Sequence, residues 1–453
     1  MKKKLLSSLS ALLILSGCSA ISQKEVFDSM NQMTVNRGVG ELVWLKTPQE
    51  VDEAGLRVNT LLKEPLSEAN AVRITLINNH VLQQAYERIG IAQSDLVQAG
   101  LMTNPLLGYS VGRGGGTSGS GVTVELAFLD LLWIPLRKEL GGLALEETKY
   151  SVGDEVLRTV RDAKKSYIDA RVAQEAVRLN KEVLKSHEAS VQLAMRQYTA
   201  GNLAKRDLLK IQDEYAHTRL ESIRFHRENA VAREALNKMM GVYAGQTEYK
   251  FSEEPLRLTA MFPKSDGLER LAIANRLDIA AAMKAVEYAA KEAGYTKNTR
   301  ILSEVILDGG SEKSTDTGRF NTIGLKIPMP IFDMGQARLS RTQAYYNQSV
   351  QRLYEMAINA RSQTREAYAI SRYTYDSANE YQTTIVTINQ NIMEETQRYY
   401  NGMLDGIYEL LADQRRYSEA KIQALYAIGE YQKAQVDLLY TIGGKNILFE
   451  DAQ

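Results

Sequence analysis

Cysteine is almost absent from this chain: Cys18 is the only one in 453 residues, so no disulfide bond can form within the chain. Proline is scarce and unevenly placed, because none of the eight prolines falls within 136–254 or 331–453. Since a proline inside a helix costs about 3 kcal/mol, we expect long helices in these two stretches. The charge is balanced, with 55 basic and 55 acidic residues, and gives no bulk attraction for nucleic acid.

Motifs that carry catalysis or hold a cofactor are also missing. The four histidines are His80, His187, His217 and His226. None of them stands at the spacing of a metal-binding motif. The glycine-rich stretch 114–121 lacks the Gly-Lys-Ser/Thr ending of a phosphate-binding loop. We therefore expect no enzyme, no metal centre and no bound cofactor.

Residues 1–17 have the pattern of a signal peptide. A basic start is followed by the apolar run Leu5–Leu15 and small residues, which is too short for a transmembrane helix. Leu15-Ser-Gly-Cys18 looks like a bacterial lipobox, which implies cleavage before Cys18 and acylation of that residue. The alternative is a chance cysteine near an ordinary cleavage site. In this lipoprotein class, Ser19 after the cysteine suits the outer membrane of a Gram-negative bacterium.

Two stretches, 106–129 and 301–327, have the alternating pattern of β-hairpins. We expect their tips at 113–121 and 309–319, where glycine, serine and polar residues gather. After the leader no run of 18 or more apolar residues occurs, which excludes a membrane-spanning helix but not membrane strands. The alternative is a small soluble antiparallel sheet.

Helical patterns fill most of the remaining chain. Ala170, Val177 and Leu184 fall seven apart, a period that makes helices supercoil around each other. At 1.5 Å per residue a helix over 139–200 would be about 90 Å long. The predicted helices are 66–98, 139–200, 202–240, 268–297, 334–400 and 408–442. Residues 18–65 are predicted to form an acylated, extended tether.

The chain carries the same unit twice, as repeats 66–254 and 255–453. Gly201 and Gly402 lie 201 positions apart, each between two long helical patterns, where we expect a positive φ that favours glycine. Each unit joins a β-hairpin to a long coiled-coil helical hairpin, so the predicted fold is mainly α with a small β part. Four strands cannot close a barrel, so strands in a membrane would have to be pooled from several chains.

These features together resemble the TolC-type outer membrane factor family, in a lipoprotein form. The resemblance covers about 66–444 and includes Asn104-Pro105 before the first strand and Pro328-Met-Pro-Ile-Phe-Asp-Met-Gly335 after the last. It implies a homotrimer whose twelve strands form one outer-membrane β-barrel on an α-helical periplasmic tunnel. It also implies efflux, with substrate received from an inner-membrane pump through a periplasmic adaptor.

The resemblance also assigns roles near the two helix turns. Asp207 matches an acidic gate position of the family, and Tyr399 matches a tyrosine of the closed state. Other positions depart from the family pattern: Leu404 replaces an arginine, and Tyr408 and Leu411 replace carboxylates. The implied adaptor-docking residues are Gly201, Asn202, Gly402 and Met403, and the implied entrance-gate residues are Asp207, Tyr399, Asp405 and Tyr408. For Asp405, a solvated residue at the turn is the alternative.

Two other functions remain open at this point. One is a non-conducting coiled-coil lipoprotein that spaces the envelope, and the other is the exit duct of a type I protein secretion system. A spacer has no use for two alternating hairpins, which favours the channel. Drugs, metal ions and proteins all remain possible substrates.

Overall fold

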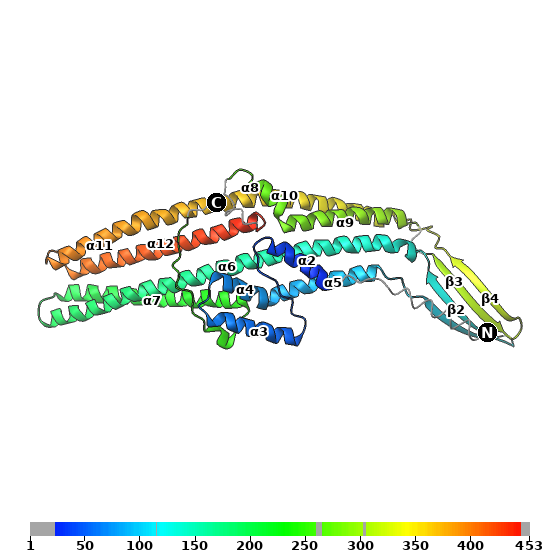
Figure 1. Cartoon of the computed structure of the whole chain (residues 1–453), viewed down its shortest axis with the longest axis horizontal. Coiled ribbons are helices and arrows are strands. Elements are labelled where there is room, and N and C mark those ends of the chain that lie inside the picture. Colours follow the sequence, from blue (N-terminus) through cyan, green and yellow to red (C-terminus); the bar gives the residue numbers. More distant parts are fainter. Residues whose placement is uncertain (1–22, 115, 260–264, 302–304, 445–453) are drawn as a thin grey trace. The chain divides into compact units, whose positions relative to one another are not determined.

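The computed structural model describes residues 23–114, 116–259, 265–301 and 305–444 (Figure 1). Cys18 and the leader lie outside these residues, so the acylation of Cys18 stays a prediction. Among the described residues, no helix combines the length and the apolar character needed to cross a membrane.

The chain folds as two compact units, and α6 runs from one into the other. Of the described residues, the first unit holds 23–30, 85–152 and 277–356, and the second holds the remainder. In chain order the α-helices are α2 (Gln23–Val35), α3 (Pro48–Lys63), α4 (Glu68–Asn78), α5 (His80–Ala99), α6 (Asp130–Thr199), α7 (Lys205–Met240), α8 (Leu268–Asn275), α9 (Leu277–Thr299), α10 (Gln336–Glu380), α11 (Val386–Asn401) and α12 (Ile407–Thr441).

The long helices predicted from the proline-free stretches are confirmed. α6 has 70 residues and begins at Asp130, nine positions before the predicted start, with Pro135 inside its first turns. α7 and α12 agree with the predicted return helices within a few residues. α10 and α11 form the predicted long helix. They are joined by a π-helical segment at Tyr381–Ile385 that was not predicted from the sequence.

The prediction of an extended tether over 18–65 is wrong, because the described part contains α2 and α3. α3 begins with a capping box that the sequence displays as Thr47-Pro-Gln-Glu50. The Thr47 hydroxyl accepts a hydrogen bond from the Glu50 amide at 3.2 Å, and Glu50 accepts one from the Thr47 amide at 2.9 Å. These bonds satisfy backbone donors that the first helical turn leaves free.

The helices predicted at 66–98 and 268–297 are each interrupted. The first breaks at Asn79, whose side-chain oxygen accepts hydrogen bonds from the amides of Val81 and Leu82 and so starts α5. The Asn79 amide group also donates to the Met239 carbonyl at 2.8 Å, which ties the break to the end of α7. The second breaks at Arg276, where the backbone is extended.

The two hairpins are confirmed, and they join in one antiparallel sheet of order β1–β2–β3–β4 (Figure 1). The strands are β1 (Leu106–Gly114), β2 (Thr117–Ala127), β3 (Ile306–Ser314) and β4 (Gly318–Lys326). β2 pairs with β3, so the two repeats meet in the middle of the sheet. The predicted tips 113–121 and 309–319 are too long, because pairing continues through most of their small residues.

The two sides of this sheet differ in chemistry. Because side chains alternate along a strand, the register assigns every residue to one side or the other. One side, called the apolar face, carries exposed Leu107, Tyr109, Val111, Val122, Val124, Leu307, Ile323 and Leu325. The other side, called the polar face, carries Ser110, Thr123, Glu125, Asp308, Glu312, Thr322 and Lys326.

Glycines on the polar face make room for larger polar neighbours. A Cβ atom at Gly324 would lie 2.5 Å from a carboxylate oxygen of Asp308. Lys326 forms an ion pair with Glu125 and lies 4.0 Å from Asp308, which links three adjacent strands. The side chains of the polar face are therefore crowded and pair with one another, whereas the side chains of the apolar face are exposed.

Among the described residues, the core of the second unit includes three hydrophobic clusters along the helices. One surrounds Tyr167 and Phe251, and a second lies around Ile168 and Phe225. The third, called the turn cluster, contains Ala194, Leu208, Ile211 and Leu411. It packs the beginning of α12 against the α6–α7 hairpin, close to the turn at Gly201.

Candidate functional site at the helix turns

The turn between α6 and α7 closes at Gly201 as the sequence predicts. The Asn202 amide donates to the Gln197 carbonyl at 2.8 Å, and the Gly201 amide donates to the Tyr198 carbonyl at 3.0 Å. These two bonds form a Schellman motif, which requires a left-handed residue after the helix. Gly201 has a φ of 77° and supplies it. Gly201 and Asn202 are both exposed.

The turn between α11 and α12 closes with the same two hydrogen bonds. They lie one residue later than the spacing of 201 between Gly201 and Gly402 predicts. The Leu404 amide donates to the Tyr399 carbonyl at 2.9 Å, and the Met403 amide donates to the Tyr400 carbonyl at 3.0 Å. The left-handed residue is therefore Met403, with a φ of 58°, while Gly402 has a φ of −82°. The prediction of a positive φ at Gly402 is wrong. A left-handed conformation costs about 1–2 kcal/mol at a residue with a side chain.

The apolar pattern gives a reason for this shift. In a Schellman motif the residue after the left-handed position commonly contacts the helix position five residues earlier. With Met403 in the left-handed position, this pair is Leu404 and Tyr399. With Gly402 there, the pair would be Met403 and Arg398, which includes a charged side chain.

The shift changes which residues of the two turns are equivalent. Near the turns the repeat spacing is 202, because Gly201 corresponds to Met403 and the first residue of α7 to the first residue of α12. Asp207, in the first turn of α7, therefore corresponds to Glu409, in the first turn of α12. The prediction that Tyr408 occupies the acidic slot of the second repeat is wrong by one position. Both repeats keep a carboxylate there.

The implied gate residues have different surroundings. Asp207 is half-buried and pairs with Arg206 at 3.2 Å on its own helix. Tyr408 of α12 lies under the Lys210 ammonium of α7, with 5.0 Å between the nitrogen and the ring centre. Tyr399 and Asp405 are exposed. Tyr408 is therefore a contact between the two helical hairpins, while Asp405 lies in the exposed turn.

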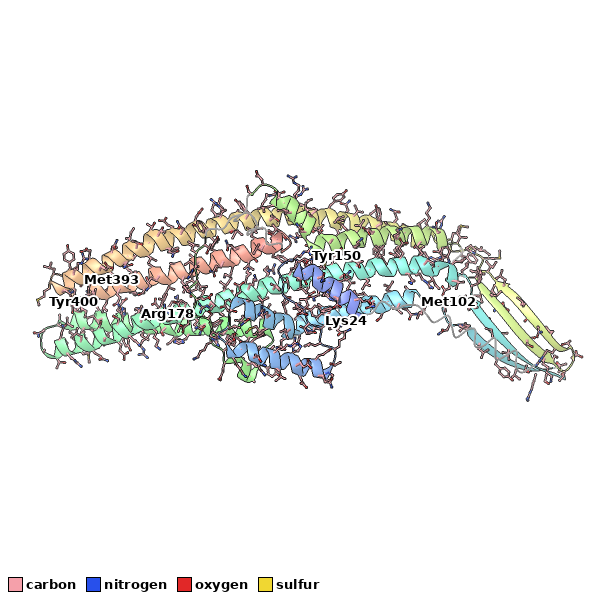
Figure 2. All side chains as sticks on the ribbon, viewed as in Figure 1. Lys24, Met102, Tyr150, Arg178, Met393 and Tyr400 are labelled. Carbon is pink, nitrogen blue, oxygen red and sulfur yellow. The ribbon has the colours of Figure 1, made fainter. Side chains whose placement is uncertain are left out.

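The end of the second hairpin is unusually apolar for an exposed turn. Met403 is 94% exposed and Leu404 is 72% exposed. Tyr400, at the end of α11, lies beside this turn in Figure 2. Exposed apolar groups at the end of a hairpin favour a partner that covers them.

Arg415 of α12 binds α7 through a group of carboxylates. Its guanidinium lies 2.7 Å from Glu214 and 3.5 Å from Glu221, both on α7, and 2.8 Å from Glu419 on its own helix. The hydrogen bond to Glu214 raises the pKa of Arg415 above its ordinary value. Arg415 thus holds the two hairpins together above the turn cluster.

His187 lies at the same junction and is almost fully buried, with 1% of its surface exposed. Its Nδ1 atom is 2.9 Å from the Thr218 hydroxyl of α7. Beside it, the Ser186 hydroxyl of α6 donates to Gln414 of α12 at 2.8 Å. Burial lowers the pKa of His187, so the imidazole is neutral at neutral pH.

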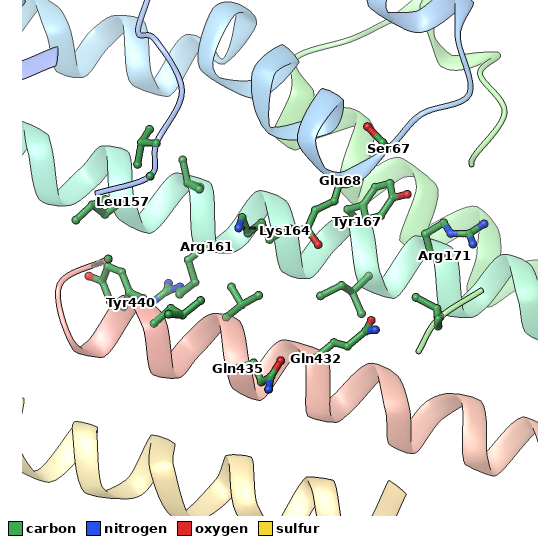
Figure 3. Close-up of a pocket in the computed structure, with 18 of the residues that line it drawn as sticks. Ser67, Glu68, Leu157, Arg161, Lys164, Tyr167, Arg171, Gln432, Gln435 and Tyr440 are labelled. Atoms are coloured by element: carbon green, nitrogen blue, oxygen red, sulfur yellow. Dashed lines mark ion pairs between the residues drawn. The ribbon is translucent and has the colours of Figure 1, made fainter. Parts of the chain in front are cut away.

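A cavity of about 490 Å³ lies between α6 and α12 in the second unit (Figure 3). Its lining includes cations, but each of them has a partner. Lys164 lies 3.3 Å from Glu68, Arg161 lies 2.8 Å from Asp162, and Arg171 donates to the Glu254 carbonyl at 2.6 Å. Lys164 and Arg161 are therefore paired with carboxylates, whereas the partner of Arg171 is an uncharged backbone carbonyl.

Metal binding has no site within the described residues, where no group of three or more histidine, cysteine or acidic side chains is placed to hold an ion. Asp413, another acid near the second turn, accepts a hydrogen bond from Thr396 of α11 at 2.7 Å and pairs with Arg416 at 2.9 Å. Its carboxylate therefore joins α11 to α12.

Comparison with known proteins gives a consistent result. Residues 268–444 match the family model described as outer membrane efflux protein. The CmeC outer membrane channel of Campylobacter jejuni has a TM-score of 0.72 at 14% identity, over 91% of each chain. CusC has a TM-score of 0.69 at 17% identity, over 86% of this chain and 92% of that chain. The family model thus covers residues 268–444, and these solved structures share the fold over most of the chain.

Two relatives show how far the sequences diverge. Nodulation protein T of Rhizobium leguminosarum bv. viciae is 23% identical over 393 residues, which cover 82% of this chain and 80% of the relative. Cation efflux system protein CusC of Escherichia coli K12 is 24% identical over 317 residues, which cover 67% of each chain.

Sequence reasoning missed three residues near the helix turns. Glu409 was recognisable as an acidic residue in the first turn of a helix, once the true start of α12 was known. His187 and Arg415 had no signal in the sequence, because their partners lie on helices that are distant along the chain.

Proposed function

We propose that this protein is the outer-membrane channel of a tripartite efflux system. It would export metal cations or small toxic compounds that an inner-membrane pump delivers through a periplasmic adaptor. The fold is that of channel proteins, and CusC is named as a cation efflux system protein. Acylation of Cys18 would add a lipid anchor.

The observation that carries the proposal is the combination of open edges and an apolar face in one small sheet. The strands have 9, 11, 9 and 9 residues, which suits strands that cross a bilayer. β1 and β4 are the outer strands of the sheet, and their free edges need partners inside a membrane. Three copies would supply them by pooling twelve strands into a closed barrel.

The helix turns would form the periplasmic end of the channel. Gly201, Asn202, Gly402 and Met403 lie in exposed turns, where an adaptor could dock against the apolar Met403. Asp207, Tyr399, Asp405 and Tyr408 are proposed for the entrance gate, together with Glu409. Carboxylates repeated from three copies would favour cations.

The decisive experiment deletes the gene and compares the strain with one carrying the wild-type gene on a plasmid. We expect the deletion strain to become more sensitive to metal salts or dyes, and the plasmid to restore resistance. The purified protein should also conduct ions in planar bilayers.

Other outcomes would contradict efflux. Unchanged sensitivity together with loss of a secreted protein would favour a protein export duct. A purified protein that never conducts, in a strain with envelope defects alone, would favour a structural spacer.

A further inference from the structure

The border between apolar and polar residues crosses the apolar face obliquely. Val111 of β1 and Ile323 of β4 do not lie opposite each other in the register. When only side chains on the apolar face are counted, Val111 lies two positions closer to the hairpin tips than Ile323. Yet Val111 is the last apolar residue before Arg113 on β1, and Ile323 is the last before Asn321 on β4. Between the outer strands β1 and β4 the border therefore drops by four residues, about 13 Å, across three strand spacings of about 4.8 Å. On β3 the last apolar residue of this face is Leu307, one row lower than Ile323.

The slope of the border gives the inclination of the strands. A drop of about 13 Å over about 14 Å corresponds to strands inclined by about 45° to the normal of the border. Strands in transmembrane sheets are inclined by 35–45°. The border thus has the slope that a flat membrane boundary would draw across tilted strands.

Three exposed basic side chains lie just beyond this border on the same side of the sheet. Arg113 is the first outward residue after the border on β1. Lys313 on β3 and Arg319 on β4 lie opposite each other in the register, and Arg319 is the second outward residue after the border on its strand. None of the three forms an ion pair with an acid among the described residues.

None of the acidic residues within the four strands lies on this side of the sheet. Glu125, Asp308 and Glu312 all belong to the polar face. Glu312 directly precedes Lys313 but points to the polar face, and Asp316 lies in the turn between β3 and β4, three positions from both Lys313 and Arg319. A ligand that covers the apolar face would therefore meet apolar rows and then a row of cations.

We propose that Arg113, Lys313 and Arg319 bind phosphate groups of membrane lipid headgroups whose acyl chains cover the apolar face. This inference rests on the membrane location in the proposed function. Guanidinium groups hold phosphate oxygens through paired hydrogen bonds, and an ammonium group adds a mobile donor. Each basic group near an anionic lipid surface contributes about 1 kcal/mol, which is about fivefold in affinity.

The test uses the full-length purified oligomer and two lipids that differ only by a phosphate, phosphatidic acid and diacylglycerol with the same acyl chains. Native mass spectrometry counts the lipids retained, and thermal unfolding measures the stabilisation. We expect phosphatidic acid to be retained preferentially. The triple variant Arg113→Gln, Lys313→Gln, Arg319→Gln should lose this preference by on the order of 100-fold.

A matched control removes the same charge from an exposed stretch of α6, as Arg178→Gln, Lys181→Gln, Lys185→Gln. This variant should retain phosphatidic acid like the wild type. Equal retention by both triple variants, or equal retention of the two lipids by the wild type, would overturn the proposal. Stabilisation by inorganic phosphate equal to that by phosphatidic acid would overturn the assignment to lipid.

Failure of the proposed function gives a different result. A wild-type protein that neither inserts into bilayers nor conducts would refute the channel and the lipid site together. A protein that inserts and conducts without any preference for the phosphate would refute the lipid site alone.

Discussion

At the scale of single residues, the two turn glycines have different tasks. Gly201 holds a φ of 77° in open space, so its backbone conformation alone disfavours other residues there. Gly402 has a negative φ, and a Cβ atom there would meet the nearest carbonyl oxygens at 3.5 Å, an ordinary contact. The left-handed position of the second turn belongs to Met403.

We therefore expect Gly201→Ala to destabilise its turn by about 1 kcal/mol and Gly402→Ala to change stability by less than about 0.5 kcal/mol. Met403→Gly should do the reverse of Gly201→Ala and stabilise the second turn. Amide hydrogen exchange at the two turns, read by mass spectrometry, measures each change. Equal effects of the two alanine substitutions would contradict the assignment of the left-handed residue to Met403.

At the scale of elements, α12 is held against the α6–α7 hairpin by a junction that contains a buried imidazole. Thr218 of α7 faces His187, and Glu214 of α7 and Arg415 of α12 are the charged groups that act on it. Burial is the largest effect and lowers the pKa of His187 below its ordinary value of 6.5.

The sign of the pH effect follows from this shift. Below about pH 6.5 the unfolded chain takes up a proton that the folded junction resists, so the free energy of unfolding falls as the pH falls. We expect a loss of up to about 1 kcal/mol per chain between pH 7.5 and pH 5.5 that is absent in His187→Gln. Thermal unfolding at the two pH values measures it.

His217 provides the control, because its side chain is 59% exposed on α7. His217→Gln should keep the acid sensitivity of the wild type. If His187→Gln and the wild type lost equal stability at pH 5.5, the sensitivity would arise elsewhere.

At the scale of the whole molecule, the apolar face of the sheet is the surface that we propose to contact lipid. Ile323, on the apolar face, is 88% exposed, and Phe320, three residues earlier on β4, lies on the polar face and is 45% exposed. A lysine at each position places the same cation on opposite sides of one strand.

We expect Ile323→Lys to reduce recovery in the membrane fraction, because a cation on a lipid-facing strand costs about 2–4 kcal/mol at mid-depth and less toward the membrane boundary, where Ile323 lies. Phe320→Lys should insert like the wild type. Membrane fractionation followed by unheated gel electrophoresis measures insertion and oligomer together. Equal loss in both variants would show that the apolar face does not meet lipid.

The local sequence predicted the helix lengths and the hairpins well. Proline-free stretches and apolar periods identified α6, α7 and α12, and alternation identified both hairpins. α3 could also have been found, because its capping box lies within four residues. The breaks in the other helices are different. Asn79 bonds to the Met239 carbonyl, 160 positions away, and no short window reveals such a partner.

The sequence by itself determined the duplicated architecture and the two faces of the sheet, since helix period, strand alternation and proline placement are local properties of the chain. Only the tertiary structure decided the register of the second turn, and with it the equivalence of Glu409 to Asp207. The same holds for His187 and Arg415, whose environments come from the packing of three helices. Hydrogen bonds and packing between distant segments decide these features, while each segment alone is compatible with several arrangements.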